Sequence, residues 1–537
     1  MTSETTAPTV RAAALDVLRA CGLTTVFSNP GSTEVPLLAG WPRDLRFVLA
    51  LHEASVVGMA TGWAIASGEP AFVLLHTTAG LGNGVAALAT ARVNRAPLVV
   101  LVGQQDRRHL AAEPFLAGKL EGLAGEYPVW VHTPPRAQEV PAAILRAWHE
   151  ARAARGPALV IVPMDDWMAP AGDARERSAA PQVVRAPAID PAAVEALEGL
   201  LAASLSPALV VGAGADDPET WNALVALAER LACPVWQESF GARAGFPQDH
   251  PLFAGHLPAG RARLRDTLGA HDFVLAVGAP VFRQYPYEPG PFVPANTRLA
   301  IVTDDAAEAH RSPVQLAIVG PPAGVCRLLA DRLPARTGRP VARRSPAPPH
   351  PSADGRLRAG DVLAALAERL PRDVVLVEEC PSSRPELHRR IPARAPLGFL
   401  SAAMGGLGFA LPAAIGVRMA RPQRPVVAVV GDGSSMYAIQ ALWSAAYYRV
   451  GVLFVILANG GYAVMDRLAE KHGGGAPWPS FDVRVSDMAR AMGCQAVRID
   501  DQAALLRVLD EVMPRLAGRE EPLLIEVAIT PDATFEP

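Results

Sequence analysis

Short apolar runs alternate with segments of helical pattern along the whole 537-residue chain. Runs such as AFVLLH (71–76), PLVVLVG (97–103) and PVVAVVG (425–431) are almost continuously apolar. Strands that are buried on both faces of a parallel sheet have this character, because helices cover both faces of such a sheet. The alternation therefore predicts the α/β class, with doubly wound parallel sheets.

Two stretches rich in proline, alanine and arginine interrupt this alternation, at 172–191 and 334–355. They are interpreted as linkers, because such segments cannot join a packed sheet. They divide the chain into three predicted domains, 1–172, 190–334 and 356–537, each long enough for one sheet with helices on both faces. The apolar runs predict strands at 24–28, 46–51, 71–76, 97–103, 157–162, 207–212, 234–239, 272–278, 298–302, 373–379, 425–431, 450–459 and 522–529.

The composition excludes several classes of protein. Hydrophobic residues make up 50% of the chain, so large buried cores are expected, and the net charge of -3 provides no basic surface for nucleic acid. The apolar runs are shorter than the ~18 residues of a membrane span. The polar N-terminus lacks a signal-peptide pattern, and the five scattered cysteines suit a cytoplasmic protein. Only two lysines occur, neither in a Walker loop, so a nucleotide site of that kind is excluded.

Polar residues follow two predicted strands of the last domain. The run 426–430 ends at Gly431-Asp432-Gly433, where Ser434 is expected to cap a helix, and the run 452–457 ends just before Asn459. Ligands collect at the carboxyl ends of parallel strands, and two oxygen donors there suit Mg2+ with a phosphate. The alternative is that GDGS is only a turn and Asn459 only a cap. The pairing of the two strand ends favours the functional interpretation.

GDGS followed after about 27 residues by NG resembles the signature of the thiamine-diphosphate enzymes. The usual signature ends in Asn-Asn-Gly, and Ala458 stands here for the first asparagine. The resemblance implies that pyrimidine-binding, middle and diphosphate-binding domains follow one another along the chain. It implies that Mg2+ is bound by Asp432, Asn459 and the Gly461 carbonyl. It also implies that Gly433, Ser434 and Tyr462 bind the cofactor.

Several other segments resemble the benzoylformate decarboxylase branch of that family: 28–36, 49–58, 74–84, 278–283 and 404–416. The resemblance implies a homotetramer, a dimer of dimers whose cofactor sites lie between two subunits. It also makes Leu407 the apolar wedge that bends the cofactor, and the Gly405 carbonyl an acceptor for the cofactor's amino group. The alternative for Leu407 is an ordinary core position.

Glu53 lies between the apolar run 46–51 and an apolar helical segment. Thiamine chemistry requires a carboxylic acid against the pyrimidine ring, and apolar surroundings favour the neutral form of such an acid. The alternative is a carboxylate that complements a helix dipole. Spacing alone does not decide between the two, but together with the C-terminal signature it favours Glu53 as the cofactor's acid.

His76 ends the run 71–76 and Ser32 lies within NPGS. The family resemblance implies that His76 is an acid/base in the pocket and that Ser32 binds the substrate carboxylate or carbonyl. The alternatives are a satisfied buried histidine and a turn or helix cap. The acetohydroxyacid synthase branch usually carries small residues at this position, so His76 favours a decarboxylase.

Two positions depart from the benzoylformate decarboxylase pattern. Tyr285 stands where that branch has a second pocket histidine, and Pro381 where it has a pocket hydroxyl. A tyrosine, whose reference pKa is near ~10, donates hydrogen bonds but transfers protons poorly at neutral pH. The Gly-x-Gly of VVGAGADD (210–217) lacks the third glycine of a dinucleotide site and favours a tight turn.

These patterns predict a cytoplasmic lyase that uses thiamine diphosphate and Mg2+ to decarboxylate a 2-oxo acid, with an aromatic acid favoured. Glu53, His76, Ser32 and Tyr285 are its expected catalytic residues. Carboligation with an acceptor aldehyde to a 2-hydroxy ketone is a further expected outcome. The alternatives are a dedicated carboligase and a catalytically silent, cofactor-binding paralogue.

Overall fold

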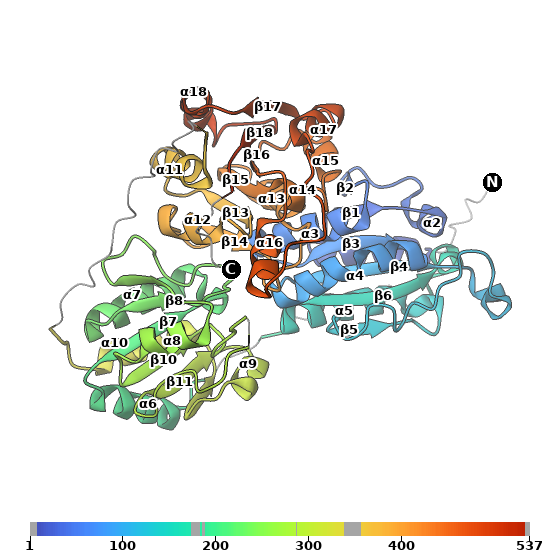
Figure 1. The fold of residues 1–537 in the computed structure, drawn as a ribbon. Coiled ribbons are helices and arrows are strands. Elements are labelled where there is room, and N and C mark those ends of the chain that lie inside the picture. The colour runs from blue at the N-terminus through green and yellow to red at the C-terminus, as the bar shows by residue number, and fades with distance from the viewer. Residues whose placement is uncertain (1–7, 173–182, 185–187, 286, 338–355, 532–537) are drawn as a thin grey trace, which may run out of the picture. The chain divides into compact units, whose positions relative to one another are not determined.

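A computed structural model describes residues 8–172, 183–184, 188–285, 287–337 and 356–531. It contains three six-stranded sheets with flanking helices (Figure 1). The α/β prediction is therefore confirmed. The two stretches interpreted as linkers lie largely outside the described residues, and the exact domain boundaries stay a prediction.

The first sheet has the strand order β2-β1-β3-β4-β6-β5, and all of its pairs are parallel. Its strands are β1 (Thr25–Asn29), β2 (Arg46–Leu49), β3 (Ala71–His76), β4 (Leu98–Gln104), β5 (Trp130–His132) and β6 (Pro157–Pro163). The helices of this part are α1 (Val10–Ala20), α2 (Val35–Leu38), α3 (Glu53–Ser67), α4 (Thr77–Val93) and α5 (Val140–Ala154).

The second sheet has the order β12-β11-β10-β7-β8-β9. Counted from its own first strand, this is the 3-2-1-4-5-6 order of doubly wound dinucleotide-binding folds. Its strands are β7 (Pro207–Val211), β8 (Val235–Gln237), β9 (Phe253–His256), β10 (Phe273–Val277), β11 (Arg298–Thr303) and β12 (Leu316–Val319). Its helices are α6 (Pro191–Ala203), α7 (Pro218–Leu231), α8 (Arg261–Leu268), α9 (Ala306–Arg311) and α10 (Pro322–Arg332).

The third sheet has the order β14-β13-β15-β16-β18-β17, which repeats the topology of the first sheet. Its strands are β13 (Val375–Glu379), β14 (Phe399–Ser401), β15 (Val426–Gly431), β16 (Leu453–Ala458), β17 (Gln495–Ile499) and β18 (Leu523–Ala528). Its helices are α11 (Ala359–Arg369), α12 (Arg384–Arg390), α13 (Ala410–Ala420), α14 (Asp432–Ser435), α15 (Ala441–Tyr447), α16 (Ala463–Lys471), α17 (Val485–Ala491) and α18 (Gln502–Val512).

The chain forms two compact units. One comprises residues 1–183, 377–381 and 402–537, and the other comprises residues 184–376 and 382–401. Within the first unit, segments of the first and last thirds of the sequence pack together through α3 and α13. The sequence does not predict this pairing, which unites the two sheets of identical strand order.

Glycines allow α3 and α13 to approach closely. A Cβ atom on Gly62 would lie 2.1 Å from the carbonyl oxygen of Ala413, and one on Gly416 would lie 1.9 Å from that of Met59. Any larger side chain at either position would therefore separate the helices. Both helices begin beside predicted site residues, so their packing fixes these residues within one rigid framework.

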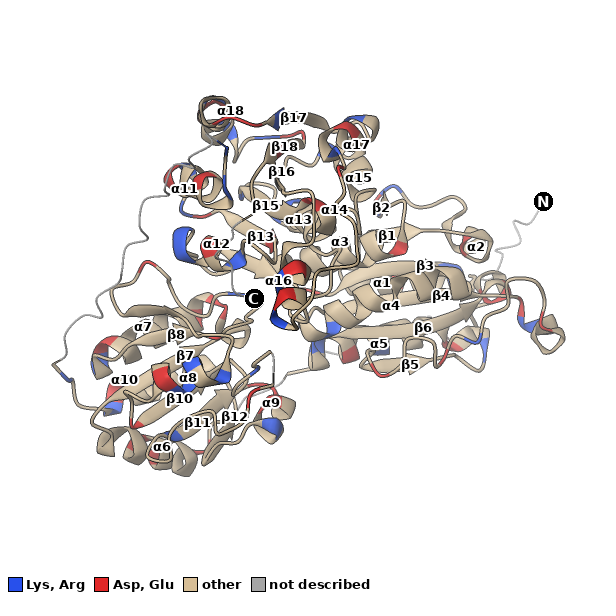
Figure 2. Cartoon of the chain, viewed as in Figure 1, with Lys and Arg blue, Asp and Glu red and all other residues tan. Residues whose placement is uncertain are grey.

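Burial explains the strand composition. The central strands β4, β6 and β7 are buried along their whole length, and Figure 2 shows the charged residues mainly on helices and loops.

All five cysteines are free and buried. Within the described part of the chain, no helix is both long and apolar enough to cross a membrane.

Candidate active site

Glu53 is the first residue of α3 and is 6% exposed. The amide of Asn29, at the end of β1, donates to Oε1 at 3.0 Å, and the amide of Asn83, in α4, donates to Oε2 at 3.1 Å. Burial of the acid agrees with the expected apolar surroundings, and the structure adds two polar contacts that the sequence did not predict. Two amides from neighbouring elements hold the carboxylate, which fixes its orientation at the carboxyl edge of the first sheet.

His76 ends β3 and lies against a buried carboxylate that the sequence did not reveal. Its Nδ1 is 3.0 Å from Oε2 of Glu34 and 3.0 Å from the hydroxyl of Thr33. The Glu34 side chain has no exposed surface, while that of His76 is 15% exposed. Glu34 thus orients His76, whose ring remains partly exposed.

Glycines make room for this carboxylate–histidine pair. A Cβ atom on Gly31 would lie 2.4 Å from the His76 ring, and one on Gly103 would lie 1.8 Å from Glu34 Oε1. The Gly31 amide also donates to Glu34 Oε2 at 2.7 Å. The backbone therefore makes room for the pair at two places, the loop after β1 and the end of β4, and the sequence around Glu34 does not predict this.

The structure brings Glu53 and His76 together. A Cβ atom on Gly80 would lie 3.4 Å from His76 Cβ and 3.6 Å from Glu53 Cγ, so both side chains border the same glycine of α4. Ser32 is exposed and begins a short 3-10 helix whose N-cap is Gly31, so Ser32 is not the cap. The predicted catalytic set of the first domain therefore clusters at one sheet edge.

Asp432 lies at the equivalent edge of the third sheet, after β15, and is 4% exposed. The Gly433 amide donates to Oδ1 at 2.9 Å and the Gly460 amide donates to Oδ2 at 2.8 Å. Burial raises the pKa of Asp432, and these backbone donors oppose that shift. The predicted helix is a single turn, α14, with Gly431 as its N-cap, so the prediction that Ser434 caps it is wrong.

Asn459 follows β16, the strand beside β15, and its Oδ1 accepts from the Gly461 amide at 3.1 Å. The rings of Tyr462 and Phe481 are in contact, with centroids 5.1 Å apart. A Cβ atom on Gly433 would lie 2.8 Å from Tyr462 and 3.1 Å from Phe481. A larger residue at position 433 would therefore require the Tyr462 ring to move.

The donor chemistry of this edge fits Mg2+ bound through a diphosphate. Among the described residues, no group of three His, Cys, Asp or Glu side chains could hold a metal ion. The predicted set instead offers one carboxylate, one amide and one carbonyl oxygen, namely Asp432, Asn459 and Gly461. A hard cation with so few protein ligands requires phosphate oxygens or waters to complete its shell.

Gly405 and Leu407 lie in the turn before α13. Gly405 and Gly408 have positive φ angles of 70° and 88°, which glycine adopts without strain. Leu407 is 38% exposed, so it is not an ordinary core residue. In the described part of the chain, no hydrogen bond joins Glu53 to Asp432: Glu53 accepts from Asn29 and Asn83, and Asp432 from Gly433 and Gly460.

The two departures from the family pattern are both exposed. Tyr285 is 60% exposed, in the loop after β10, and Pro381 is exposed after β13. The structure therefore gives neither residue a packing role that would explain its identity. Their placement in the pocket stays a prediction.

The Gly-x-Gly turn of the middle sheet closes on protein atoms. The Gly214 amide donates to the Gly278 carbonyl at 2.8 Å, and a Cβ on Gly212 would lie 2.4 Å from Glu238 Oε1. Dinucleotide folds place a phosphate at this turn. The Glu238 side chain occupies the space beside the turn, so the geometry favours the tight-turn interpretation.

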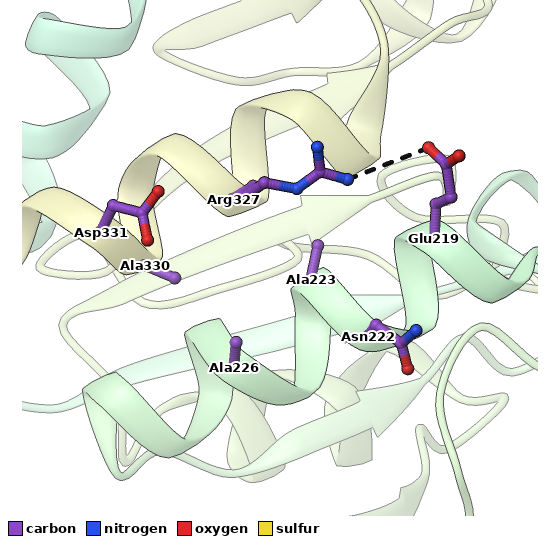
Figure 3. Close-up of a pocket in the computed structure, with 7 residues that line it drawn as sticks. All are labelled: Glu219, Asn222, Ala223, Ala226, Arg327, Ala330 and Asp331. Atoms are coloured by element: carbon purple, nitrogen blue, oxygen red, sulfur yellow. Dashed lines mark ion pairs between the residues drawn. The ribbon is translucent and has the colours of Figure 1, made fainter.

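A shallow cavity of about 340 Å3 lies elsewhere in the middle unit (Figure 3). It is lined by Glu219, Asn222, Ala223, Ala226, Arg327, Ala330 and Asp331 of α7 and α10. Glu219 and Arg327 form an ion pair at 3.9 Å across it. Its floor consists of small alanines, and it contains none of the predicted site residues.

Three family models match the chain in order. They are the N-terminal TPP binding domain of thiamine pyrophosphate enzymes at residues 8–122, the central domain at 194–329 and the C-terminal TPP binding domain at 382–527. The chain belongs to the thiamine pyrophosphate enzyme family. The resemblance found in the sequence is thereby confirmed.

Within the thiamine pyrophosphate enzyme family, the chain is similar to benzoylformate decarboxylases. It is 40% identical to the benzoylformate decarboxylase of Pseudomonas aeruginosa, with 98% of this chain and 100% of the relative covered. The 4-hydroxybenzoylformate decarboxylase of Rhodococcus jostii RHA1 superimposes with a TM-score of 0.93 at 35% identity, covering 98% and 100% of the two chains. The benzoylformate decarboxylase of Polynucleobacter necessarius gives 0.92 at 33%, covering 98% and 99%.

Proposed function

We propose that this thiamine pyrophosphate enzyme decarboxylates an aromatic 2-oxo acid without oxidation, using thiamine diphosphate and Mg2+. The observation that carries the proposal is His76, held by the buried Glu34 and bordering the same glycine as Glu53. The similarity to benzoylformate decarboxylases over nearly the whole chain supports the substrate class. The protein is proposed to act in the cytoplasm, where its free, buried thiols remain reduced.

Asp432, Asn459 and the Gly461 carbonyl would hold Mg2+, with Gly433, Ser434 and Tyr462 around the diphosphate. Leu407 and the Gly405 carbonyl would orient the two rings of the cofactor. Thiamine diphosphate, when bound, supplies the electron sink that makes loss of CO2 feasible. The protein's contribution is to bind the cofactor, orient it and move protons.

Glu53 is proposed to exchange a proton with the cofactor's pyrimidine nitrogen. The amides of Asn29 and Asn83 hold its oxygens in place for that transfer. His76 is proposed to deliver or take up a proton at the substrate, because Glu34 fixes its Nδ1 and leaves Nε2 for exchange. Ser32, exposed at the same edge, would donate a hydrogen bond to the substrate carboxylate or carbonyl.

A complete site is proposed to form between two subunits of a homotetramer, a dimer of dimers. The contacts of Glu53 lie in the first domain and those of Asp432 in the third. Each chain thus carries two half-sites, each at the carboxyl edge of a sheet with the same strand order. Joining half-sites of two chains would enclose the cofactor between them.

A dedicated carboligase is the second candidate, and Tyr285 is the residue that favours it. A tyrosine in place of a pocket histidine would slow protonation and leave time for an acceptor aldehyde to react. A silent paralogue is less well supported, because the chain retains Glu53 and Asp432, each buried with a hydrogen bond to both carboxylate oxygens.

The test is a panel of aromatic and aliphatic 2-oxo acids supplied with thiamine diphosphate and Mg2+. CO2, aldehyde and hydroxy ketone are measured for each acid. Release of CO2 and aldehyde from an aromatic acid is the expected result. Hydroxy ketone as the main product would favour the carboligase, and no CO2 from any acid would contradict the proposal.

A further inference from the structure

Glu379, the last residue of β13, places a buried carboxylate at the start of α13. It is 5% exposed. The Gly408 amide donates to Oε1 at 2.6 Å, and the amides of Phe409 and Ala410 donate to Oε2 at 2.8 and 2.6 Å. One side chain thus satisfies three consecutive backbone donors that the helix itself leaves unpaired.

The turn that these bonds hold has little rigidity of its own. The N-cap of α13, Phe409, has no side-chain capping bond. Gly405 and Gly408 both have positive φ angles, and glycine is the residue with the greatest backbone freedom. Leu407 projects from this turn with 38% of its surface exposed, so packing in the core does not fix it. An anchor from outside is needed to hold the turn in one conformation.

We propose that Glu379 is a positioning residue for the cofactor, anchoring the Gly405–Leu407 turn against the thiamine rings. The inference rests on the proposed function, and it concerns the rings of the cofactor rather than its diphosphate. Asp432 has separate donors, Gly433 and Gly460, so the diphosphate half of the site does not depend on Glu379. Loss of the anchor should therefore affect one half of the cofactor only.

A simple helix cap would not require this residue. Burial raises the pKa of Glu379 to about 7, so keeping the carboxylate ionised costs free energy. Exposed serine, threonine, aspartate or asparagine caps avoid that cost. The ionised form accepts all three bonds and predominates above about pH 7, so binding is best measured at about pH 8.

Glu379→Gln is the test variant and Glu378→Gln the matched control. Glu378 is the neighbouring buried glutamate, and its Oε1 accepts from the Cys380 amide at 2.7 Å instead of from α13. Calorimetry with Mg2+ measures two ligands on each full-length protein, thiamine diphosphate and inorganic pyrophosphate. Glu379→Gln should lose about tenfold in affinity for thiamine diphosphate and keep its affinity for pyrophosphate. The control should match wild type for both ligands.

Unchanged affinity of Glu379→Gln for thiamine diphosphate would overturn the inference. An equal loss of affinity for thiamine diphosphate and pyrophosphate would also overturn it, because Glu379 would then have only a general structural role. Failure of the wild type to bind thiamine diphosphate would instead reject the proposed function itself. Should Glu379→Gln fail to fold, Glu379→Asp keeps the charge but shortens the side chain, so it should show the same selective loss. Unchanged affinity of Glu379→Asp for thiamine diphosphate would also overturn the inference.

Discussion

Nδ1 of His76 lies 3.0 Å from Oε2 of Glu34, whose side chain is completely buried. An ionised carboxylate only accepts hydrogen bonds, so Nδ1 carries the proton and Nε2 is left to exchange one. The Thr33 hydroxyl and the Gly31 amide bind the same carboxylate, which therefore cannot turn away from the histidine. This pairing assigns Glu34 a role that depends entirely on its contact with His76.

Glu34→Gln is expected to lower kcat/KM by about 10- to 100-fold, because a partner that orients a ring nitrogen typically has effects of this size. Nitrogen NMR of His76 should show loss of the single Nδ1–H tautomer. Glu121→Gln, at an exposed glutamate, is the control. Wild-type activity with an unchanged tautomer would mean that Glu34 is only structural.

Asp432→Ala is expected to weaken thiamine diphosphate binding at least about tenfold in the presence of Mg2+. The change removes the only carboxylate of the predicted metal-binding set, while β15 and the fold should survive. Calorimetric titration measures the affinity, and Asp482→Ala, at an exposed aspartate, is the control. Equal affinity in wild type and Asp432→Ala would reject the metal assignment.

Glu53→Gln is expected to preserve cofactor binding and to slow hydrogen exchange at the cofactor's C2 position by at least about a hundredfold. An amide keeps the shape of the carboxylic acid, and its one oxygen can still accept from Asn29 or Asn83, but it cannot transfer a proton. Quenched-flow exchange followed by proton NMR measures the rate. An exchange rate equal to wild type would remove Glu53 from this role.

Tyr285→His is expected to increase aldehyde release relative to hydroxy-ketone formation from the same 2-oxo acid. Histidine transfers protons near neutral pH, so protonation should compete better with an added aldehyde. A tenfold change in the product ratio corresponds to only about 1.4 kcal/mol of barrier difference. Tyr287→His, two residues further along and 85% exposed, is the matched control. An unchanged ratio in folded, cofactor-saturated Tyr285→His would show that Tyr285 does not control the outcome.

Glu238→Gln is expected to change how stability depends on pH. Burial raises the pKa of Glu238 from 4.5 to about 7, although Arg283 opposes the shift; Glu308 adds to it and Arg311 opposes it. The folded state therefore binds a proton more tightly than the unfolded state. The resulting stabilisation is fully present below pH 4.5 and is lost as the pH rises through about 7.

The size of this contribution is on the order of 3 kcal/mol. Thermal unfolding of wild type and Glu238→Gln between about pH 5 and about pH 8 measures it. Wild type should lose stability relative to the variant over that range. Parallel curves for the two proteins would contradict the raised pKa.

Strong local patterns determined most of the strands. Long apolar runs such as 97–103 and 425–431 match β4 and β15, because a strand buried on both faces has few polar positions. The patterns missed the five strands β5, β9, β12, β14 and β17, and each of them lies at the edge of its sheet. Edge strands here are short, and most are partly exposed, so they lack a continuous apolar run.

Residues with a strong local signal were also found in the sequence. Asp432 stands between two glycines at a strand end, and Asn459 follows the next strand, so chain geometry alone predicts their proximity. Family resemblance added Glu53, His76, Gly405 and Leu407. None of these assignments required knowledge of which helices touch.

The carboxylates that complete the site were decided by tertiary structure alone. Glu34 and Glu379 have no distinguishing local pattern, because an isolated glutamate is usually exposed. Glu34 becomes buried only because His76 and Gly103, far along the chain, surround it, and Glu379 because the start of α13 turns its amides toward it. Sequence periodicity indicates which face of a helix or strand is apolar. The partner of a buried charge depends instead on which distant segments of the chain pack together in the folded protein.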